Sequence, residues 1–297
     1  MQLGTCVKKS ILLYTSIIIT VLPMKLWLSG ILLCVMSGLS IQAQTVDTIS
    51  VYSPSMNKQF RNVLILPKGY GKDTTQKYPT VYLLHGFGER YDGWLKRIKP
   101  NLPQLASRYN MIIVCPEGGR SWYWDSPVNP EIRFETYVSR ELPNYIDSHY
   151  ATYASRKTRA ITGFSMGGHG ALWLTFRHPD IFGAGGSMSG GVDIRPFPEK
   201  WDMKVQLGEY SQNPERWDAY TVINQIPESN AADLPALIID CGSEDFFYEV
   251  NQALHEKLLA RHIPHDFIIR PGAHNRPYWK NAIDYQLLFF HLFFTRE

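Results

Sequence analysis

The sequence motif Gly163-Phe164-Ser165-Met166-Gly167 constrains the fold of this chain more than any other feature. A strand-like run ends at Thr162 before the motif, and a helix-like run over 168–176 follows it. A serine between two glycines at such a junction is typical of a nucleophile elbow, in which the glycines permit a tight turn and the serine hydroxyl stands exposed above a sheet. We therefore predict that Ser165 is a nucleophile; the alternative is a Gly-Ser turn that arose by chance.

The alternation of short apolar runs with longer amphipathic segments predicts one α/β domain over 44–297, with a mainly parallel sheet and helices on both of its faces. Two runs, 51–52 and 61–66, are expected to open the sheet as an antiparallel pair. Later strands are expected at 81–84, 111–115, 160–162, 183–188, 237–240 and 266–269, and helices at 134–150, 167–176, 248–259 and 279–294. The segment 191–230 has many prolines and aromatic residues and weak periodicity. We interpret it as a short insertion after strand 6 that packs over one end of the sheet.

Residues 1–43 are interpreted as an export leader. Lys25 precedes a long apolar run, and small or polar residues then extend to Ala43, which is the pattern of a secretory signal peptide. Because the charged-then-apolar order restarts there, Met24 is interpreted as the true start. The alternative is a membrane anchor over 11–39, although a membrane span needs about 20 uninterrupted apolar residues. We predict a secreted or periplasmic protein with no stable membrane association after cleavage.

Composition excludes several classes of protein. The 297 residues include 30 Lys and Arg against 27 Asp and Glu, and the excess of three lysines lies entirely within 1–43. The neutral remainder argues against nucleic-acid binding, which needs a basic surface. Beyond the leader only Cys115 and Cys241 remain, so a disulfide scaffold is excluded and two buried thiols are expected. No cysteine or histidine cluster has the spacing of a zinc site, and we expect neither a metal nor a cofactor.

Chain order predicts the partners of Ser165. A serine hydroxyl needs a base, and the base needs a carboxylate that orients it; in folds with this elbow they follow in the order Ser, Asp or Glu, His. His274 lies in a Gly-Pro loop after the last strand-like run and is the expected base. Asp245, beyond the turn that ends a strand, is the expected acid, with Glu244 as the alternative. Asp240 lies within or at the end of that strand, where a structural role is expected.

Backbone N–H groups are expected to bind the oxyanion that forms when a serine attacks a carbonyl group. One is the N–H of Met166, the residue after the nucleophile. The second is assigned to Phe87, in the loop after an early central strand, with Gly88 as the neighbour for which it could be mistaken. His85 lies in the same loop but precedes Ser165, so we expect it to shape the loop.

Four sequence blocks carry a resemblance to a known family: 82–88 with Trp94, 116–123, 163–168, and 242–245 with 271–274. Together they make the chain similar to the esterase D-like branch of the α/β-hydrolases. That group includes S-formylglutathione hydrolases, tributyrin-type, feruloyl and acetylxylan esterases, and secreted mycolyltransferases. The resemblance extends over about 51–294. It implies the α/β-hydrolase fold and a serine esterase, with the same triad and oxyanion donors.

The resemblance also places 121–125 at the active-site cleft. Trp122, Tyr123 and Trp124 are therefore expected to contact an acyl or sugar group; the alternative is that they only pack the loop. Secretion disfavours S-formylglutathione, an intracellular thioester, and favours acetyl, feruloyl or short-chain acyl esters such as those of plant polysaccharides. An acyltransferase with the same triad, a peptidase and a non-catalytic binding module are the other hypotheses, and the last conflicts with the presence of every expected site residue.

Overall fold

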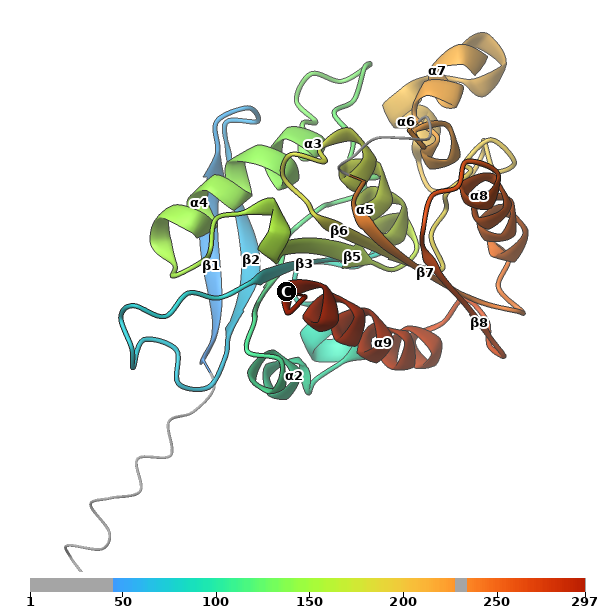
Figure 1. Cartoon of the computed structure of the whole chain (residues 1–297). Coiled ribbons are helices and arrows are strands. Elements are labelled where there is room, and N and C mark those ends of the chain that lie inside the picture. The colour runs from blue at the N-terminus through green and yellow to red at the C-terminus, as the bar shows by residue number, and fades with distance from the viewer. Residues whose placement is uncertain (1–44, 228–233, 297) are drawn as a thin grey trace, which may run out of the picture. The chain divides into compact units, whose positions relative to one another are not determined.

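The computed structural model describes residues 45–227 and 234–296, so the leader prediction lies outside the described residues. Within this part of the chain, eight strands form one sheet in the order β1-β2-β4-β3-β5-β6-β7-β8 (Figure 1). β2 pairs antiparallel with both β1 and β4, and every other neighbouring pair is parallel. The strands are β1 (Thr45–Ser53), β2 (Lys58–Leu66), β3 (Thr80–Leu84), β4 (Ile112–Cys115), β5 (Arg159–Gly163), β6 (Ala184–Met188), β7 (Ala236–Gly242) and β8 (Asp266–Arg270). The predicted mainly parallel sheet is confirmed.

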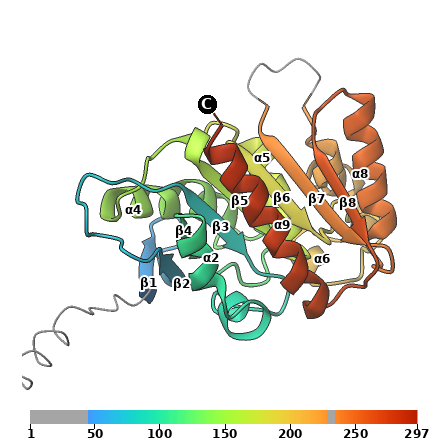
Figure 2. The same cartoon turned by 60° about the horizontal axis from the view of Figure 1, so that its bottom comes forward.

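Helices cover both faces of the sheet, as expected for strands that are apolar on both sides. Figure 2 shows α2 (Leu102–Arg108) and α9 (Arg276–Phe294) on one face, with α4 (Leu142–His149), α5 (Met166–Arg177) and α8 (Tyr248–Ala260) behind the sheet. Two clusters of buried side chains follow this division. The fully buried strands β3, β4 and β5 lie between them. Cys115 and Cys241, on β4 and β7, are buried free thiols, as predicted.

The expected helices are present with shifted ends. The helix predicted over 134–150 is built from α3 (Phe134–Thr136), a π-helical turn η2 (Tyr137–Glu141) and α4. The π turn directly precedes the pair Leu142-Pro143, and proline cannot donate an intrahelical hydrogen bond. The other π-helical turn, η1 (Trp94–Ile98), and α2 were not predicted. The terminal helix α9 buries Ile283, Leu287 and Phe290 against the sheet, which confirms its expected close packing.

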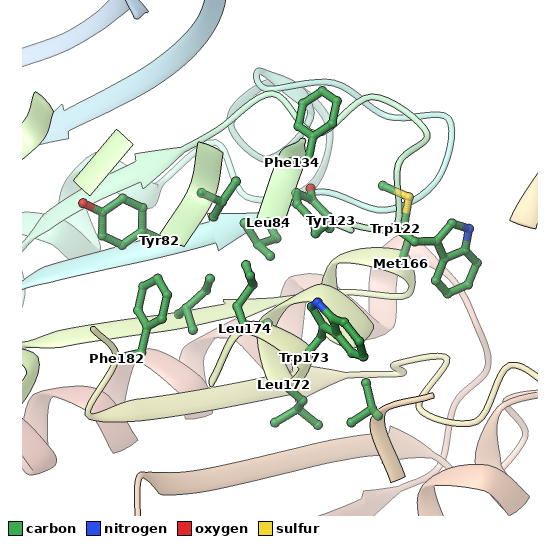
Figure 3. Packing of buried hydrophobic residues seen from close by; sticks show 14 of the residues in the cluster. Tyr82, Leu84, Trp122, Tyr123, Phe134, Met166, Leu172, Trp173, Leu174 and Phe182 are labelled. Carbon is green, nitrogen blue, oxygen red and sulfur yellow. The ribbon is translucent and has the colours of Figure 1, made fainter. Parts of the chain in front are cut away.

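The insertion after β6 contains short helices only, in the part that the structure describes. They are α6 (Met203–Leu207), η4 (Tyr210–Gln212), α7 (Pro214–Ala219) and η5 (Val222–Asn224). Outside the insertion, a 3-10 turn, η3 (Arg156–Thr158), precedes β5. Met203, Leu207 and Trp217 bury their side chains in the same core as α5, so the insertion packs on the domain, as predicted. Figure 3 shows part of this core, in which Trp122 and Tyr123 lie beside α5, the helix that carries Met166 and Trp173.

The parallel part of the sheet brings distant segments to one edge. β3, β5, β7 and β8 all run in the same direction, so the loops that follow their carboxyl ends meet there. These loops contain His85, Ser165, Asp245 and His274, respectively. In an open α/β sheet this edge is where ligands bind.

Candidate active site

Ser165 occupies a strained turn between β5 and α5. Its φ is 55° and its ψ is −121°, a conformation that costs a non-glycine residue about 1 to 3 kcal/mol. Its backbone N–H donates to the carbonyl of Met188 at 2.9 Å, which ties the turn to the neighbouring strand β6. The packed strand and helix on either side therefore hold the half-buried Ser165 in the wall of a cavity.

The glycines of the motif are required by close backbone approach. A Cβ atom on Gly163 would lie 2.6 Å from the backbone of Gly167. A Cβ on Gly167 would lie 2.7 Å from the carbonyl oxygens of Leu84 and His85. Real Cβ atoms do not approach backbone this closely, so any larger residue would force the turn away from the sheet.

His274 connects the serine to a carboxylate. Its Nε2 lies 2.9 Å from Ser165 Oγ, and its Nδ1 lies 2.9 Å from Asp245 Oδ2 and 3.0 Å from Oδ1. An ionised carboxylate only accepts hydrogen bonds, so we assign the imidazole proton to Nδ1. Nε2 is then the acceptor for the serine hydroxyl. This arrangement can remove a proton from the hydroxyl as it attacks.

Asp245 is the carboxylate that the fold brings to His274. Its side chain is fully buried, and its Oδ1 also accepts the N–H of Phe247 at 2.8 Å. Glu244 is exposed to solvent. Asp240 is buried elsewhere, where it accepts hydrogen bonds from the Tyr278 hydroxyl and from a guanidinium group, and burial raises the pKa of its carboxyl. Of the three acids considered from the sequence, Asp245 alone contacts His274.

The predicted oxyanion donors are the backbone N–H groups of Phe87, which lines the same cavity as Ser165, and of Met166, the next residue in the chain. In the described part of the chain, neither Phe87 nor Met166 donates its N–H to another protein group. Phe87 lies in a turn closed by the N–H of Glu89 on the Gly86 carbonyl at 3.1 Å, with Gly88 at φ 78°. Met166 begins the 12-residue helix α5, whose amino end favours negative charge.

His85 and Tyr123 hold the turn that contains Phe87. His85 Nδ1 lies 2.9 Å from the Gly86 carbonyl, and its Nε2 accepts the N–H of Gly118 at 2.9 Å. The Tyr123 hydroxyl accepts the N–H of His85 and donates to its carbonyl, both at 3.0 Å. His85 thus contacts its own loop through Nδ1 and the segment after β4 through Nε2, which agrees with the expectation that it shapes the loop.

Trp122, Tyr123 and Trp124 do not line the cavity at Ser165. Each is at most 1% exposed. Their burial does not fit the expected contact with substrate and supports the alternative, that they pack the loop. The indole N–H of Trp124 donates to His169 Nε2 at 2.8 Å, and His169 Nδ1 lies 2.8 Å from the Gly191 carbonyl. Burial lowers the pKa of His169 to about 4, so this histidine is neutral.

An open cavity of about 670 Å³ lies above Ser165. Its walls are largely aromatic, and the side chains that line it include those of Phe87, Phe164, Trp201, Phe246 and Trp279. Sequence reasoning missed Trp201, Phe246 and Trp279 as cavity residues. Two signals were present: Phe246 directly follows the expected acid, and Trp201 belongs to the insertion.

The cavity lining also includes charged side chains. Arg276 forms an ion pair with Glu89 at 2.8 Å, and both residues line the cavity.

Among residues 45–227 and 234–296, no group of three or more His, Cys, Asp or Glu side chains could hold a metal ion. No helix within the same residues is long and apolar enough to cross a membrane.

Known proteins similar to this chain are esterases. A family model described as "Putative esterase" matches residues 53–290. An acetyl esterase from Caldicellulosiruptor saccharolyticus is 26% identical over 254 residues, which are 79% of this chain and 94% of that protein. An esterase from Mycobacterium tuberculosis is 32% identical over 239 residues, 71% of this chain; this chain spans only 51% of that protein.

A solved ferulic acid esterase shares the fold. It is 29% identical, superposes with a TM-score of 0.73, and covers 84% of this chain and 98% of its own. The similarity to the esterase branch that the four sequence blocks indicated is therefore confirmed, and so is the predicted α/β-hydrolase architecture.

Proposed function

Because this chain belongs to the esterase family and is a serine carboxylic-ester hydrolase, we propose that Ser165, His274 and Asp245 carry out its reaction. The observation that carries the proposal is the chain of hydrogen bonds from Ser165 Oγ through both ring nitrogens of His274 to a buried carboxylate. The backbone N–H groups of Phe87 and Met166 complete the site as oxyanion donors.

In the first half of the reaction, Ser165 Oγ attacks the ester carbonyl carbon while His274 Nε2 takes the hydroxyl proton. The negative charge moves to the carbonyl oxygen, where the two N–H groups bind it; losing one such donor typically costs about 3 to 4 kcal/mol of transition-state stabilisation. The imidazolium then gives its proton to the departing alkoxide. An alcohol leaves, and the acyl group stays on the serine.

In the second half, water attacks the acyl-enzyme while His274 again takes a proton. Collapse of the second tetrahedral intermediate breaks the bond to Ser165 Oγ, which recovers its proton from the imidazolium, and the carboxylic acid leaves. Asp245 keeps the Nδ1 proton in place throughout and stabilises the charged ring. Its complete burial strengthens this interaction because water cannot screen it.

We propose acetyl, feruloyl or short-chain acyl esters, such as those on plant polysaccharides, as the substrates. The similarity to an acetyl esterase and to a ferulic acid esterase supports this class. The wide aromatic cavity above Ser165 supports it as well, since it can accept a planar acyl group. We also propose that residues 1–43 export the protein, which would bring it to such extracellular esters.

The decisive experiment compares the wild-type enzyme with Ser165→Ala on acetylated xylan, methyl ferulate and p-nitrophenyl esters of increasing chain length. We expect the substitution to abolish hydrolysis of every ester that the wild type cleaves. Ser148→Ala is the matched control because Ser148 is exposed on α4, away from the site. Hydrolysis by Ser165→Ala at the wild-type rate would show that this serine is not the nucleophile.

Two further measurements test the rest of the proposal. Product analysis with added sugar or alcohol acceptors separates a hydrolase, which releases free acid, from an acyltransferase, which forms a new ester. Amino-terminal sequencing of the protein recovered from the culture medium or periplasm should begin near residue 44. A chain that keeps its first 43 residues in the cell membrane would contradict export by cleavage.

A further inference from the structure

Aromatic side chains, Trp201 among them, line the open cavity above Ser165. We propose that Trp201 is a specificity-determining residue that favours planar aromatic acyl groups over acetyl. This inference rests on the proposed esterase function and deepens it. We name Trp201 and Phe246 together the aromatic wall.

The aromatic wall lies directly beside the catalytic groups. The rings of Trp201 and Phe246 stack with centroids 5.7 Å apart and planes 18° apart. The Phe246 ring lies 4.2 Å from the imidazole of His274, and both wall residues line the same cavity as Ser165. An acyl group bound to Ser165 Oγ therefore has an aromatic surface within reach, and 51% of Phe246 is exposed to contact it.

The backbone that presents Trp201 is unusual. Trp201 has a φ of 50° and Asp202 has a φ of 56°, so two consecutive non-glycine residues are left-handed. Such conformations persist only where the surrounding structure imposes them, and they cluster at functional sites. In the insertion, this pair ends the connection from β6 and starts α6, so the strain is located where the indole turns toward the cavity.

Two contacts hold the strained pair. The indole N–H of Trp122 donates to the carbonyl of Trp201 at 3.1 Å, and Trp122 is itself buried. Arg120 forms an ion pair with Asp202 at 2.9 Å, and its guanidinium lies 4.9 Å from the centre of the Phe87 ring. The insertion is thereby connected to the turn that supplies an oxyanion donor. The buried loop that contains Trp122 does not line the cavity, but it supports Trp201, which does.

An aromatic acyl group gains more from this wall than an acetyl group does. A planar ring can stack on an aromatic face and bury much of its area, whereas a methyl group offers little area. The wall belongs to the insertion and to the loop after Asp245, and neither supplies the proton-transfer atoms. A substitution of Trp201 should therefore change the ratio of kcat/KM values between different esters. It should have less effect on the proton-transfer steps that all esters share.

The test uses methyl ferulate and methyl acetate, which share an alcohol and differ only in the acyl group. We expect Trp201→Ala to lower the ratio of their kcat/KM values about tenfold, mainly through KM for methyl ferulate; tenfold corresponds to about 1.4 kcal/mol. Trp201→Phe should stay within about threefold of the wild type because it keeps an aromatic face. Tyr153→Ala, which removes a half-exposed ring outside the cavity, should leave the ratio unchanged.

Asp202→Asn tests the support of the wall without removing the indole. Asparagine tolerates the left-handed conformation but cannot pair with the Arg120 charge. We expect a loss of about twofold to threefold in the same ratio, as suits an ion pair that is largely exposed. This variant also keeps the proposal testable if Trp201→Ala does not fold.

A direct binding measurement complements the kinetics. In a Ser165→Ala background, calorimetric titration with ferulate should show about tenfold weaker binding once Trp201→Ala is added. An unchanged kcat/KM ratio in a folded Trp201→Ala enzyme, or unchanged ferulate binding, would overturn the inference while the esterase function stands. A wild type that cleaves methyl acetate but not methyl ferulate would overturn it too. If the wild type cleaves no ester, the proposed function itself fails.

Discussion

The buried His169 should make the stability of the protein fall between neutral and mildly acidic pH. Its Nδ1–H donates to the Gly191 carbonyl and its Nε2 accepts the indole N–H of Trp124, each at 2.8 Å, so a second ring proton would break the contact with Trp124. Burial lowers its pKa from the ordinary 6.5 to about 4 in the folded protein. Between these two pKa values, His169 therefore binds a proton in the unfolded chain but not in the folded protein.

The sign and size of the effect follow from these two pKa values. Above pH 6.5 the imidazole is neutral in both states, and the stabilising contribution is complete. As the pH falls from 6.5 toward 4, only the unfolded chain takes up the proton, so the free energy of unfolding decreases. At about 1.4 kcal/mol per pH unit, the loss is about 2 kcal/mol by pH 5 and about 3 kcal/mol by pH 4.

The assay is urea unfolding at pH 7 and pH 5, for the wild type and for His169→Asn. Asparagine keeps a neutral donor for the Gly191 carbonyl and cannot titrate. The variant should be less stable than the wild type at pH 7, because a buried ring and a hydrogen bond are lost. Its stability should nevertheless decrease by about 2 kcal/mol less on going to pH 5. Carboxylates that titrate in both proteins cancel in this comparison, so equal pH dependence of the two proteins would refute the reasoning.

Three further predictions concern the elbow, the acid and the thiols. Gly167→Ala should reduce kcat at least a hundredfold and lower the melting temperature, because its Cβ would lie 2.7 Å from the His85 carbonyl oxygen; ester hydrolysis and thermal unfolding measure this, and wild-type activity would contradict it. Asp245→Asn should lower kcat by about 10⁴, as in serine proteases, with little change in KM, because the imidazole would adopt the wrong tautomer; a kcat within tenfold of the wild type would count against Asp245 as the orienting acid. Burial raises the pKa of the thiols of Cys115 and Cys241 far above the ordinary range. Neither should react with a disulfide reagent at pH 8 until the protein unfolds, and rapid labelling of Cys115 or Cys241 in the native protein would disprove their burial.

The order of the chain was enough to predict much of the site. Ser165, Asp245 and His274 were selected because each follows a strand, and parallel strands place their carboxyl ends at one edge of the sheet. The elbow could be predicted because it depends on a local feature: two glycines, Gly163 and Gly167, must flank the serine within a five-residue segment. The structure brings the three side chains into hydrogen-bond contact, as that reasoning expects.

The aromatic residues show where sequence reasoning failed. Trp122 and Trp124 lie in a segment that resembles a cleft-lining loop, yet they are buried, and Trp122 donates to the backbone of Trp201 instead. In the sequence, Trp201 stands out only as one aromatic residue of the irregular segment 191–230. Its place beside Phe246 depends on two left-handed residues and on contacts with segments far away in the chain.

The sequence by itself determined the sheet, the elbow and the positions of Ser165, Asp245 and His274 after their strands, because periodicity, glycine requirements and strand order are properties of short segments and of their order. Only the tertiary structure decided which aromatic rings face the cavity and which support it from behind. A tryptophan carries the same apolar ring in either place. Whether that ring meets substrate or core is set by the packing of β6, the insertion and the loop after β7 against one another, and no local pattern records that packing.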